Sequence, residues 1–158
     1  MPDEAEGAAR SLQLRFPASS LEVRAALQEL LRRLPQSGFD AELPGVLEIV
    51  MAEVMNNVVE HAYRGAPGMI EVQVTSTPGR LHCRVTDFGL PMEEGRLPKG
   101  RLPGPGPDGL PEGGFGWFLI TSLAQEITYR RDGDANRLSF VLMSDPGATL
   151  SGNRPRMN

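Results

Sequence analysis

One helical pattern constrains the fold of this chain more than any other feature. Between about residues 44 and 63, apolar side chains recur in pairs every four positions. They are Val46, Leu47, Val50, Met51, Val54, Met55, Val58, Val59 and Ala62. At about 100° per residue these positions make one broad face of an α-helix, which is the pattern of a buried helix face. Gly65 and Pro67 end the pattern, so we expect a helix from about Pro44 to Tyr63.

Shorter patterns on both sides of this helix predict the other elements. Alternation of apolar and polar residues indicates strands, and a capping-box start at Ser19 and Glu22 begins a first helix. The expected strands span residues 11–16, 69–75, 80–86, 126–130 and 137–143, and a last helix spans 117–124. Sequential strands joined by short turns favour an α+β layered fold with a mainly antiparallel sheet.

The length of 158 residues favours one domain, which we place at residues 10–144. Residues 1–9 and 145–158 are polar and small, and we expect them to be flexible tails. Fifteen of the 28 residues in 89–116 are Gly or Pro, and this stretch has no apolar periodicity. A loop of this length in a small domain is usually either functional or disordered. Because it lies between two motifs described below, we expect a flexible lid at about 89–113 that covers a ligand.

Charge and cysteine content exclude several classes of protein. The net charge is −4 and no basic run exceeds two residues, which disfavours nucleic acid as a direct partner. No window approaches the ~18 apolar residues of a membrane span, and the acidic N-terminus is unlike a secretory signal. Cys83 is the only cysteine, so no intrachain disulfide can form and a reducing, cytoplasmic location is favoured. We expect Cys83 to be a small core residue of its strand.

Three polar residues lie four positions apart along the central helix: Glu53, Asn57 and His61. This spacing places them on one helix edge, at the border of the apolar face. They form either a hydrogen-bonded trio that fixes the helix or a ligand-binding edge. An Asn oxygen is a suitable ligand for Mg²⁺, and a carboxylate can accept a proton. Zinc is disfavoured because the chain has two histidines and no cysteine cluster.

A second motif, Asp87-Phe88-Gly89, follows the expected strand at 80–86. Asp and Gly are favoured in turns, so a plain turn is one interpretation. In a functional interpretation, Asp87 accepts a hydrogen bond from an exocyclic amine, and Gly89 lets a planar ring approach the backbone. Such an arrangement would suit adenine over guanine.

A third motif, Gly113-Gly114-Phe115-Gly116, precedes the last helix. Glycines at a helix N-terminus let several N–H groups converge on an anion, and the helix dipole assists them. The alternative is a flexible entry to a core helix. Lys99 and Arg101 are cations of the preceding loop. They could neutralise phosphate, but solvated loop charges are the simpler interpretation.

In this order, the three motifs resemble those of the Bergerat-fold ATPases, also called the GHKL or histidine kinase-like ATPases. That family has Glu-x-x-x-Asn on a helix, then Asp-x-Gly, then Gly-x-Gly. The segment from Glu53 to Tyr63 and the stretches at 87–91 and 111–120 are most similar to the bacterial anti-sigma factor serine/threonine kinases. The resemblance covers about residues 10–143. It implies a two-layer α/β sandwich, in which helices cover one face of a mixed, mainly antiparallel sheet.

The resemblance also implies roles for single residues. Glu53 would be the catalytic residue, acting as a general base or positioning the nucleophile. Asn57 would hold Mg²⁺ on the phosphates of ATP, and Gly114 and Gly116 would lie against those phosphates. Asp87 would bind the adenine amino group, with the glycine of its motif beside the ring.

Finally, the resemblance implies partners. A kinase of this family binds a sigma factor and phosphorylates a serine on an anti-anti-sigma antagonist of the STAS fold, with ATP and Mg²⁺ as cofactors. Such proteins commonly form homodimers. Two alternatives remain open: a non-catalytic module whose protein binding depends on ATP, and a switch kinase that controls a phosphatase. A catalytic fragment of a sensor histidine kinase is disfavoured, because no helix pair with a phospho-acceptor histidine precedes the motifs.

Overall fold

The computed structural model describes residues 10–34, 42–95, 97 and 115–144 of the chain. Its helices are α1 (Ser20–Arg33), α2 (Leu43–Asn57), the π-helical turn η1 (Val58–Ala62), the 3₁₀ turn η2 (Glu93–Gly95) and α3 (Phe115–Leu123). Its strands are β1 (Arg10–Pro17), β2 (Met69–Thr77), β3 (Arg80–Asp87), β4 (Gln125–Asp132) and β5 (Ala135–Met143). The two expected tails and most of the expected lid lie outside the described residues.

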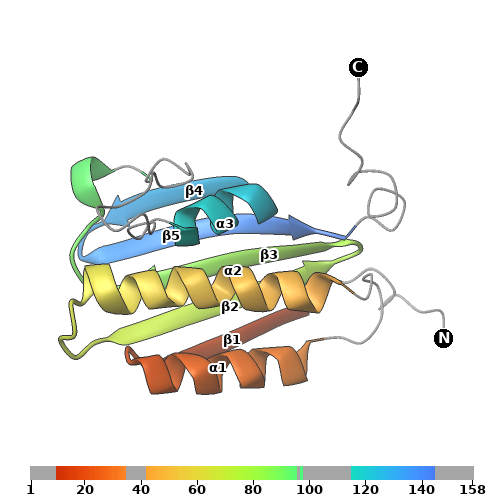
Figure 1. Ribbon diagram of the computed structural model, residues 1–158, viewed down its shortest axis with the longest axis horizontal. Coiled ribbons are helices and arrows are strands. Elements are labelled where there is room, and N and C mark those ends of the chain that lie inside the picture. Colours follow the sequence, from red (N-terminus) through yellow and green to blue (C-terminus); the bar gives the residue numbers. More distant parts are fainter. Residues whose placement is uncertain (1–9, 35–41, 96, 98–114, 145–158) are drawn as a thin grey trace, which may run out of the picture.

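The five strands form one sheet in the order β1-β2-β3-β5-β4. Each neighbouring pair is antiparallel, so the described sheet contains none of the parallel pairs that a mixed sheet would include. Helices α1, α2 and α3 all lie on the same face of the sheet (Figure 1). The predicted two-layer α+β architecture is therefore confirmed, and its sheet is antiparallel in every described pairing.

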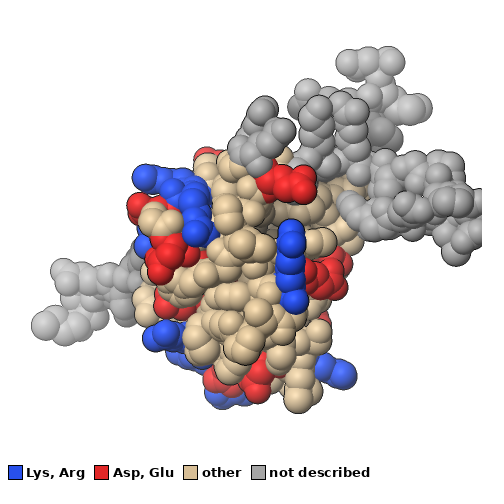
Figure 2. Space-filling view, turned by 90° about the vertical axis from the view of Figure 1, so that its left-hand side faces the viewer, with Lys and Arg blue, Asp and Glu red and all other residues tan. Residues whose placement is uncertain are grey.

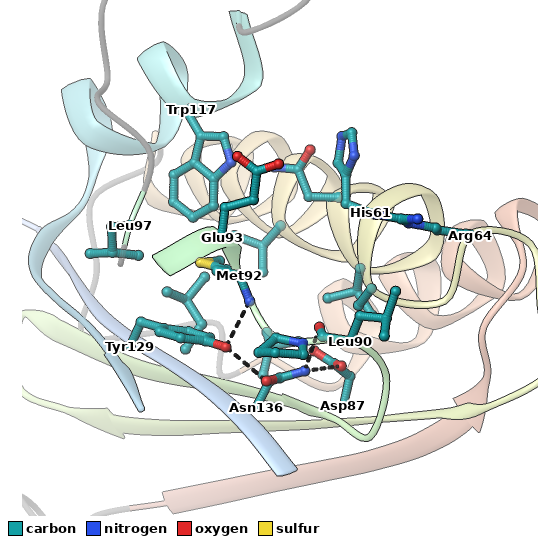
Figure 3. A pocket seen from close by; sticks show the side chains of 17 residues that line it. His61, Arg64, Asp87, Leu90, Met92, Glu93, Leu97, Trp117, Tyr129 and Asn136 are labelled. Atoms are coloured by element: carbon teal, nitrogen blue, oxygen red, sulfur yellow. Dashed lines mark hydrogen bonds between the residues drawn. The ribbon is translucent and has the colours of Figure 1, made fainter. Parts of the chain in front are cut away.

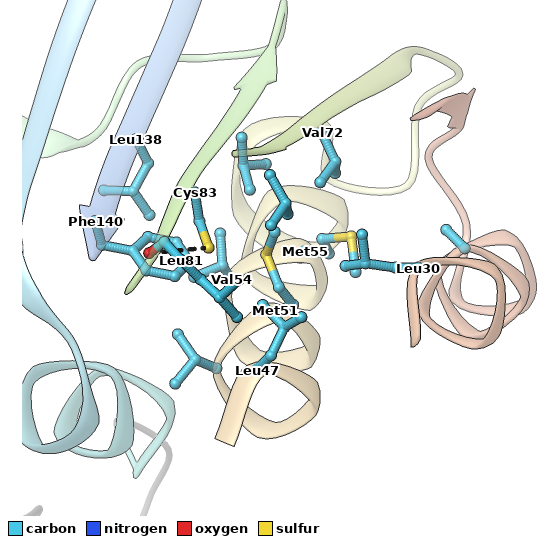
Figure 4. Packing of buried hydrophobic residues seen from close by; sticks show 14 of the residues in the cluster. Leu30, Leu47, Met51, Val54, Met55, Val72, Leu81, Cys83, Leu138 and Phe140 are labelled. Atoms are coloured by element: carbon cyan, nitrogen blue, oxygen red, sulfur yellow. Dashed lines mark hydrogen bonds between the residues drawn. The ribbon is translucent and has the colours of Figure 1, made fainter. Parts of the chain in front are cut away.

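The core lies between the helices and the inner face of the sheet. Helix α2 supplies its centre, because Leu47, Val50 and Met51 are fully buried against inward-facing strand residues such as Leu81 and Phe140 (Figure 4). Burying one such side chain contributes about 1.5–3 kcal/mol. This packing confirms the broad apolar face that the sequence predicts for the central helix.

Cys83 belongs to this core, as expected. Its side chain is buried, and burial raises the pKa of its thiol because the thiolate is poorly solvated there. A buried thiol with a raised pKa is a weak nucleophile at neutral pH. Cys83 therefore acts as a small packing residue of β3.

Helix α1 begins where the sequence predicts. The side chain of Ser19 accepts a hydrogen bond of 3.1 Å from the backbone N–H of Glu22, which satisfies one free donor of the first turn. Val23, Ala26 and Leu30 then face the core at helical spacing. The helix ends at Arg33.

The central helix departs from the expected pattern at its C-terminal end. Regular α-helix stops at Asn57, and residues 58–62 form a π-turn in which the N–H of Tyr63 donates to the carbonyl of Val58 at 3.0 Å. A π-turn holds more residues per turn than an α-helix, so the spacing rule that placed His61 on the edge of Glu53 and Asn57 does not apply beyond Asn57. π-turns of this kind are frequent at functional sites.

Acidic and basic side chains alternate over the end of the molecule shown in Figure 2, around a largely uncharged centre. Among the residues drawn in colour, this face carries no extended single-sign patch. A face of this kind lacks the basic stripe that would track a nucleic-acid backbone.

Candidate functional site

A cavity of about 660 Å³ lies between the C-terminal part of α2, η1, the start of α3 and the sheet (Figure 3). Its volume is in the range of small-molecule sites. Much of its lining is apolar, including Val54, Val58, Leu90, Trp117 and Leu138. The polar groups that line it are Asn57, His61, Arg64, Asp87, Glu93, Tyr129 and Asn136. A flat apolar ring with a few polar edge groups would match this lining.

Asp87 is the last residue of β3 and is only 5% exposed. Its Oδ1 accepts hydrogen bonds from the N–H of Gly89 at 2.9 Å and from Nδ2 of Asn136 at 2.7 Å. Desolvation raises the pKa of Asp87, while these two hydrogen bonds and the charge of Arg131 act in the opposite direction. None of the described residues donates a hydrogen bond to Oδ2. One carboxylate oxygen thus remains for a ligand in the cavity.

Asn136 is a site residue that the sequence analysis missed. It lies on β5 directly opposite Asp87 in the sheet register and is 4% exposed. Tyr129 and Arg131 of β4 donate to its Oδ1 at 2.7 and 2.9 Å. The sequence contains a pattern that could have indicated this residue. Asn136 alternates with Leu138 and Phe140, so it lies on the inward face of the strand. A polar residue on a buried strand face needs partners, which marks it as part of a structured polar group.

The chain after Asp87 is held close to the end of η1. A Cβ on Gly89 would lie 2.5 Å from the carbonyl oxygen of Ala62, so only glycine fits there without a shift. The N–H of Leu90 donates to that same carbonyl at 2.8 Å. The N–H of Met92 donates to the hydroxyl of Tyr129 at 3.0 Å. Gly89 is therefore needed for close backbone packing, in addition to its expected place beside a ring.

The first and third sequence motifs meet at Gly116. A Cβ on Gly116 would lie 2.5 Å from Oε2 of Glu53 and 3.8 Å from Nδ2 of Asn57. Helix α3 packs against α2 in the same region. Glu53, Asn57 and Gly116 are thus neighbours in space. Gly114, the other expected phosphate residue, lies outside the described residues, as do the loop cations Lys99 and Arg101.

Asn57 has a buried amide group that lacks a hydrogen-bond partner among the described residues. Its Nδ2 is buried, and its side chain makes no hydrogen bond with the described part of the chain. The described residues contain no group of three or more His, Cys, Asp or Glu that could hold a metal ion. Mg²⁺ usually keeps several waters and binds through one or two protein oxygens together with substrate phosphates. Nδ2 is a donor, so within the described part of the chain the Oδ1 of the same Asn57 amide is the atom that could take such a ligand role.

His61 does not join Glu53 and Asn57 as a polar trio. Its side chain is 75% exposed and lies 3.9 Å from the carboxylate of Glu60. It lines the cavity from beyond the π-turn. Within the described residues His61 makes no hydrogen bond to Glu53 or Asn57, which removes the hydrogen-bonded trio as an explanation of the pattern.

The fold is a two-layer α+β domain with helices on one face of the sheet and a cavity between the layers, and the sequence places it in a family. The chain belongs to the histidine kinase-like ATPase domain family, whose pattern matches residues 16–142. This confirms the family that the three motifs indicated. Among the described residues, no helix is long and apolar enough to cross a membrane.

The chain is similar to several serine-protein kinases called RsbW. It is 26% identical over 126 residues to RsbW of Bacillus thuringiensis (strain Al Hakam), and the match covers 77% of this chain and 78% of that protein. RsbW of Bacillus cereus (strain 03BB102) matches to the same extent.

Two solved structures share the fold. The RsbU and RsbW domains of Rv1364c from Mycobacterium tuberculosis match with a TM-score of 0.55 and 19% identity over 87% of this chain. This chain spans only 33% of that longer chain. The histidine kinase domain of the Erythrobacter litoralis EL346 blue-light activated histidine kinase matches with a TM-score of 0.50 and 18% identity. That match covers 96% of this chain and 72% of the other.

Proposed function

We propose that this chain is an ATP-dependent protein serine kinase of a partner-switching system. It would bind a sigma factor and phosphorylate a serine on an anti-anti-sigma antagonist of the STAS fold, in the cytoplasm and as a homodimer. The similarity to proteins named serine-protein kinase RsbW supports this class of activity. The retained Glu53 carboxylate supports catalysis over a purely binding role.

One observation carries the proposal: the carboxylate of Glu53 and the amide of Asn57 lie against Gly116, beside the cavity that Asp87 also lines. The adenine would contact Asp87, with the apolar residues of the cavity around the ring. The phosphates would then extend toward Asn57 and the start of α3, where the backbone can approach closely because Gly116 has no side chain. This arrangement places a carboxylate next to the reacting phosphate.

In the proposed reaction, the serine Oγ of the antagonist attacks the γ-phosphorus of ATP. A new O–P bond forms, the bond to the β-phosphate oxygen breaks, and ADP leaves. Glu53 accepts the proton of the serine hydroxyl or orients that hydroxyl. Asn57 would hold Mg²⁺, which when bound neutralises charge on the phosphates. Positioning and charge neutralisation are the main requirements of phosphoryl transfer, so a small domain can suffice.

Nucleotide binding is the first test. We expect Mg²⁺ and ATP together to raise the thermal midpoint, and GTP to have a much smaller effect. A ligand at about 100 times its Kd adds roughly 2.7 kcal/mol to the free energy of unfolding. Equal effects of ATP and GTP would contradict the adenine site, and no effect of either would contradict nucleotide binding.

Phosphate transfer is the decisive test. Purified chain, Mg-ATP and STAS-fold proteins from the same organism are incubated together, and phosphoserine is detected by mass spectrometry. Glu53→Gln, which keeps the shape of the side chain, should abolish transfer and retain the ATP-induced thermal shift. If the wild-type chain binds ATP and a STAS protein but transfers no phosphate, the non-catalytic binding module is the correct function.

A further inference from the structure

We propose that Asn136 is a positioning residue for nucleotide selection. It donates a hydrogen bond to Oδ1 of Asp87, so that only Oδ2 is left to accept a hydrogen bond from the exocyclic amine of adenine. The proposal rests on the ATP site proposed above. It assigns a role to a strand residue outside the three sequence motifs. Asn136 does not touch the nucleotide in this proposal and acts through Asp87.

The geometry of the pair supports this role. Asn136 and Asp87 are cross-strand partners on β5 and β3, and Nδ2 of Asn136 donates to Oδ1 at 2.7 Å (Figure 3). The N–H of Gly89 donates to the same oxygen at 2.9 Å. Two donors hold Oδ1, and they fix the plane of the carboxylate. The remaining oxygen is the acceptor that a ligand in the cavity can use.

The amide of Asn136 is fixed in one orientation by its other neighbours. Nη1 of Arg131 can only donate, and it contacts one amide atom of Asn136 at 2.9 Å. That atom is therefore the oxygen. The carbonyl of Leu90 can only accept, and it lies 3.0 Å from the other amide atom, which is therefore the nitrogen. A flipped amide would place a donor against the Arg131 N–H and an acceptor against the Leu90 carbonyl, so these contacts turn the NH₂ group toward Asp87.

This hydrogen bond also favours the charged form of Asp87. Burial raises the pKa of Asp87, and the hydrogen bond from Asn136 is the largest effect that lowers it. Without that donor, burial is opposed only by the Gly89 N–H and the charge of Arg131, and the carboxyl group takes up a proton more readily. A protonated carboxyl group would present a donor where adenine also presents one. Loss of the Asn136 donor should therefore weaken ATP binding, and more so at lower pH.

Other charged and titratable groups surround this pair. Arg131 and Tyr129 approach from β4, and Tyr63 approaches from the end of η1, where its hydroxyl accepts from the N–H of Phe88. The groups that line the same cavity are His61, Arg64 and Glu93. All of them are unchanged in variants at position 136. The ratio of variant to wild-type affinity at each pH therefore cancels the titration of ATP itself and of groups that do not contact position 136.

Two substitutions at Asn136 should give opposite pH profiles. Asn136→Leu has a similar shape and no donor, so its ATP affinity relative to wild type should fall as the pH is lowered. Asn136→Asp places a second carboxyl group against Asp87. At low pH the two groups share a proton and keep a hydrogen bond, whereas at high pH both ionise and repel. Its relative affinity should fall as the pH is raised. The limiting slope in each case is about tenfold per pH unit.

The experiment measures Kd for Mg-ATP by calorimetry from about pH 5 to about pH 9, over which single-proton effects can be resolved. Far-UV circular dichroism at each pH confirms that the proteins are folded. Ser139→Ala serves as the matched control, because Ser139 lies on β5 with its hydroxyl toward Arg84 of the outer sheet face. The ATP affinity of this control relative to wild type should not change with pH. Flat ratios for both Asn136 variants, or slopes of the same sign, would overturn the proposal.

Two further comparisons keep the test decisive. If Asn136→Leu does not fold, the sign of the slope for Asn136→Asp decides alone, since that variant keeps an oxygen acceptor for Tyr129 and Arg131. Wild-type affinities for ATP and for ITP, which has a carbonyl in place of the amine, test the underlying site. Failure of the wild-type chain to prefer ATP would contradict the proposed ATP site. A clear preference for ATP without opposite slopes would contradict only the role of Asn136.

Discussion

The carboxylate of Glu53 fills the space that a side chain on Gly116 would need. A Cβ at Gly116 would come within 2.5 Å of Oε2 of Glu53, closer than non-bonded atoms approach. Glu53 is on α2 and Gly116 is in the first turn of α3, so the contact joins two helices that are separated by two strands, β2 and β3, in the sequence. It places a proton acceptor at the helix start where the phosphates of ATP are proposed to lie.

Gly116→Ala should separate activity from stability. The added methyl group meets the far end of a flexible side chain, which can move, and alanine is a better helix former than glycine by about 1 kcal/mol. We expect the free energy of unfolding to stay equal or to rise by up to about 1 kcal/mol. Phosphate transfer should fall by about 100-fold, because a displacement of about 1 Å at the reacting centre has that effect. Urea unfolding and single-turnover transfer at saturating ATP measure the two quantities.

Gly45→Ala is the matched control for that variant. Gly45 lies in the first turn of α2, and a Cβ there would have no atom within 4 Å. The same exchange should raise stability to a similar extent and leave phosphate transfer unchanged. Equal loss of activity in both variants would show that contact with Glu53 is not the cause.

Gly89→Ala should instead destabilise the fold. Its Cβ would lie 2.5 Å from the carbonyl oxygen and 2.7 Å from the carbonyl carbon of Ala62, and backbone atoms cannot rotate away. We expect the free energy of unfolding to decrease by about 1–3 kcal/mol, the usual range for overpacking. ATP affinity should also fall, since the N–H of Gly89 holds Asp87. Urea unfolding and calorimetric titration test both effects, and wild-type stability in this variant would contradict the close contact.

Asp87→Asn should keep the fold and lose the ligand. An Asn oxygen at the position of Oδ1 can still accept from Gly89 and Asn136, so the local hydrogen bonds survive. The amide nitrogen then replaces Oδ2 and presents a donor to the amine of adenine. We expect the ATP-induced thermal shift to disappear while the unfolding midpoint without ligand changes little. An undiminished shift would rule out Asp87 as the adenine acceptor.

The same variant should change how stability depends on pH. The pKa of Asp87 is raised in the folded protein, mainly by desolvation. The contribution of this group to stability is therefore fully present below its unfolded pKa of about 3.9 and is lost as the pH rises through its folded pKa. Asparagine does not titrate. The free energy of unfolding of Asp87→Asn, relative to that of wild type, should thus increase from about pH 4 upward. Urea unfolding at a series of pH values measures this difference.

Much of the fold followed from local patterns in the sequence. The order of strands and helices was predicted correctly, because alternation and helical periodicity each report on a few neighbouring residues. The cap at Ser19 and the buried face of α2 were also predicted, since both depend on side chains close in sequence. Asp87 and Asn57, which the motifs assign to one ATP site, line one cavity, and Gly116 lies beside Asn57. Their roles in binding and catalysis remain predictions.

Other features of the site depend on contacts that local patterns do not contain. The π-turn after Asn57 has the same apolar spacing as an α-helix, so periodicity could not reveal it. Asn136 joins Asp87 only through the register of β3 with β5, and Tyr129 reaches Asn136 only through the register of β4 with β5. Strand registers depend on turn geometry and on pairing between segments that lie far apart in the sequence, so the alternation within one strand does not reveal them.

Asn57→Leu should stabilise the free protein and remove its response to Mg²⁺. Nδ2 of Asn57 is buried and has no hydrogen-bond partner among the described residues. An unsatisfied buried donor costs about 1–3 kcal/mol, and leucine has a similar shape without that donor. We therefore expect the free energy of unfolding without nucleotide to rise by about 1 kcal/mol or more. The part of the ATP-induced thermal shift that requires Mg²⁺ should be lost, because the proposed ligand oxygen is absent.

Asn56→Leu is the control, since it makes the same exchange at the preceding amide, which does not line the cavity. That variant should keep the Mg²⁺-dependent shift. Urea unfolding without ligand, and thermal unfolding with ATP in the presence of Mg²⁺ or of EDTA, give the two readings. If Asn57→Leu lowers stability and keeps the Mg²⁺-dependent shift, Asn57 is a structural residue and the metal has another ligand. If it raises stability and loses the shift, the chain retains an unsatisfied amide at a cost to its own stability because the nucleotide complex needs it.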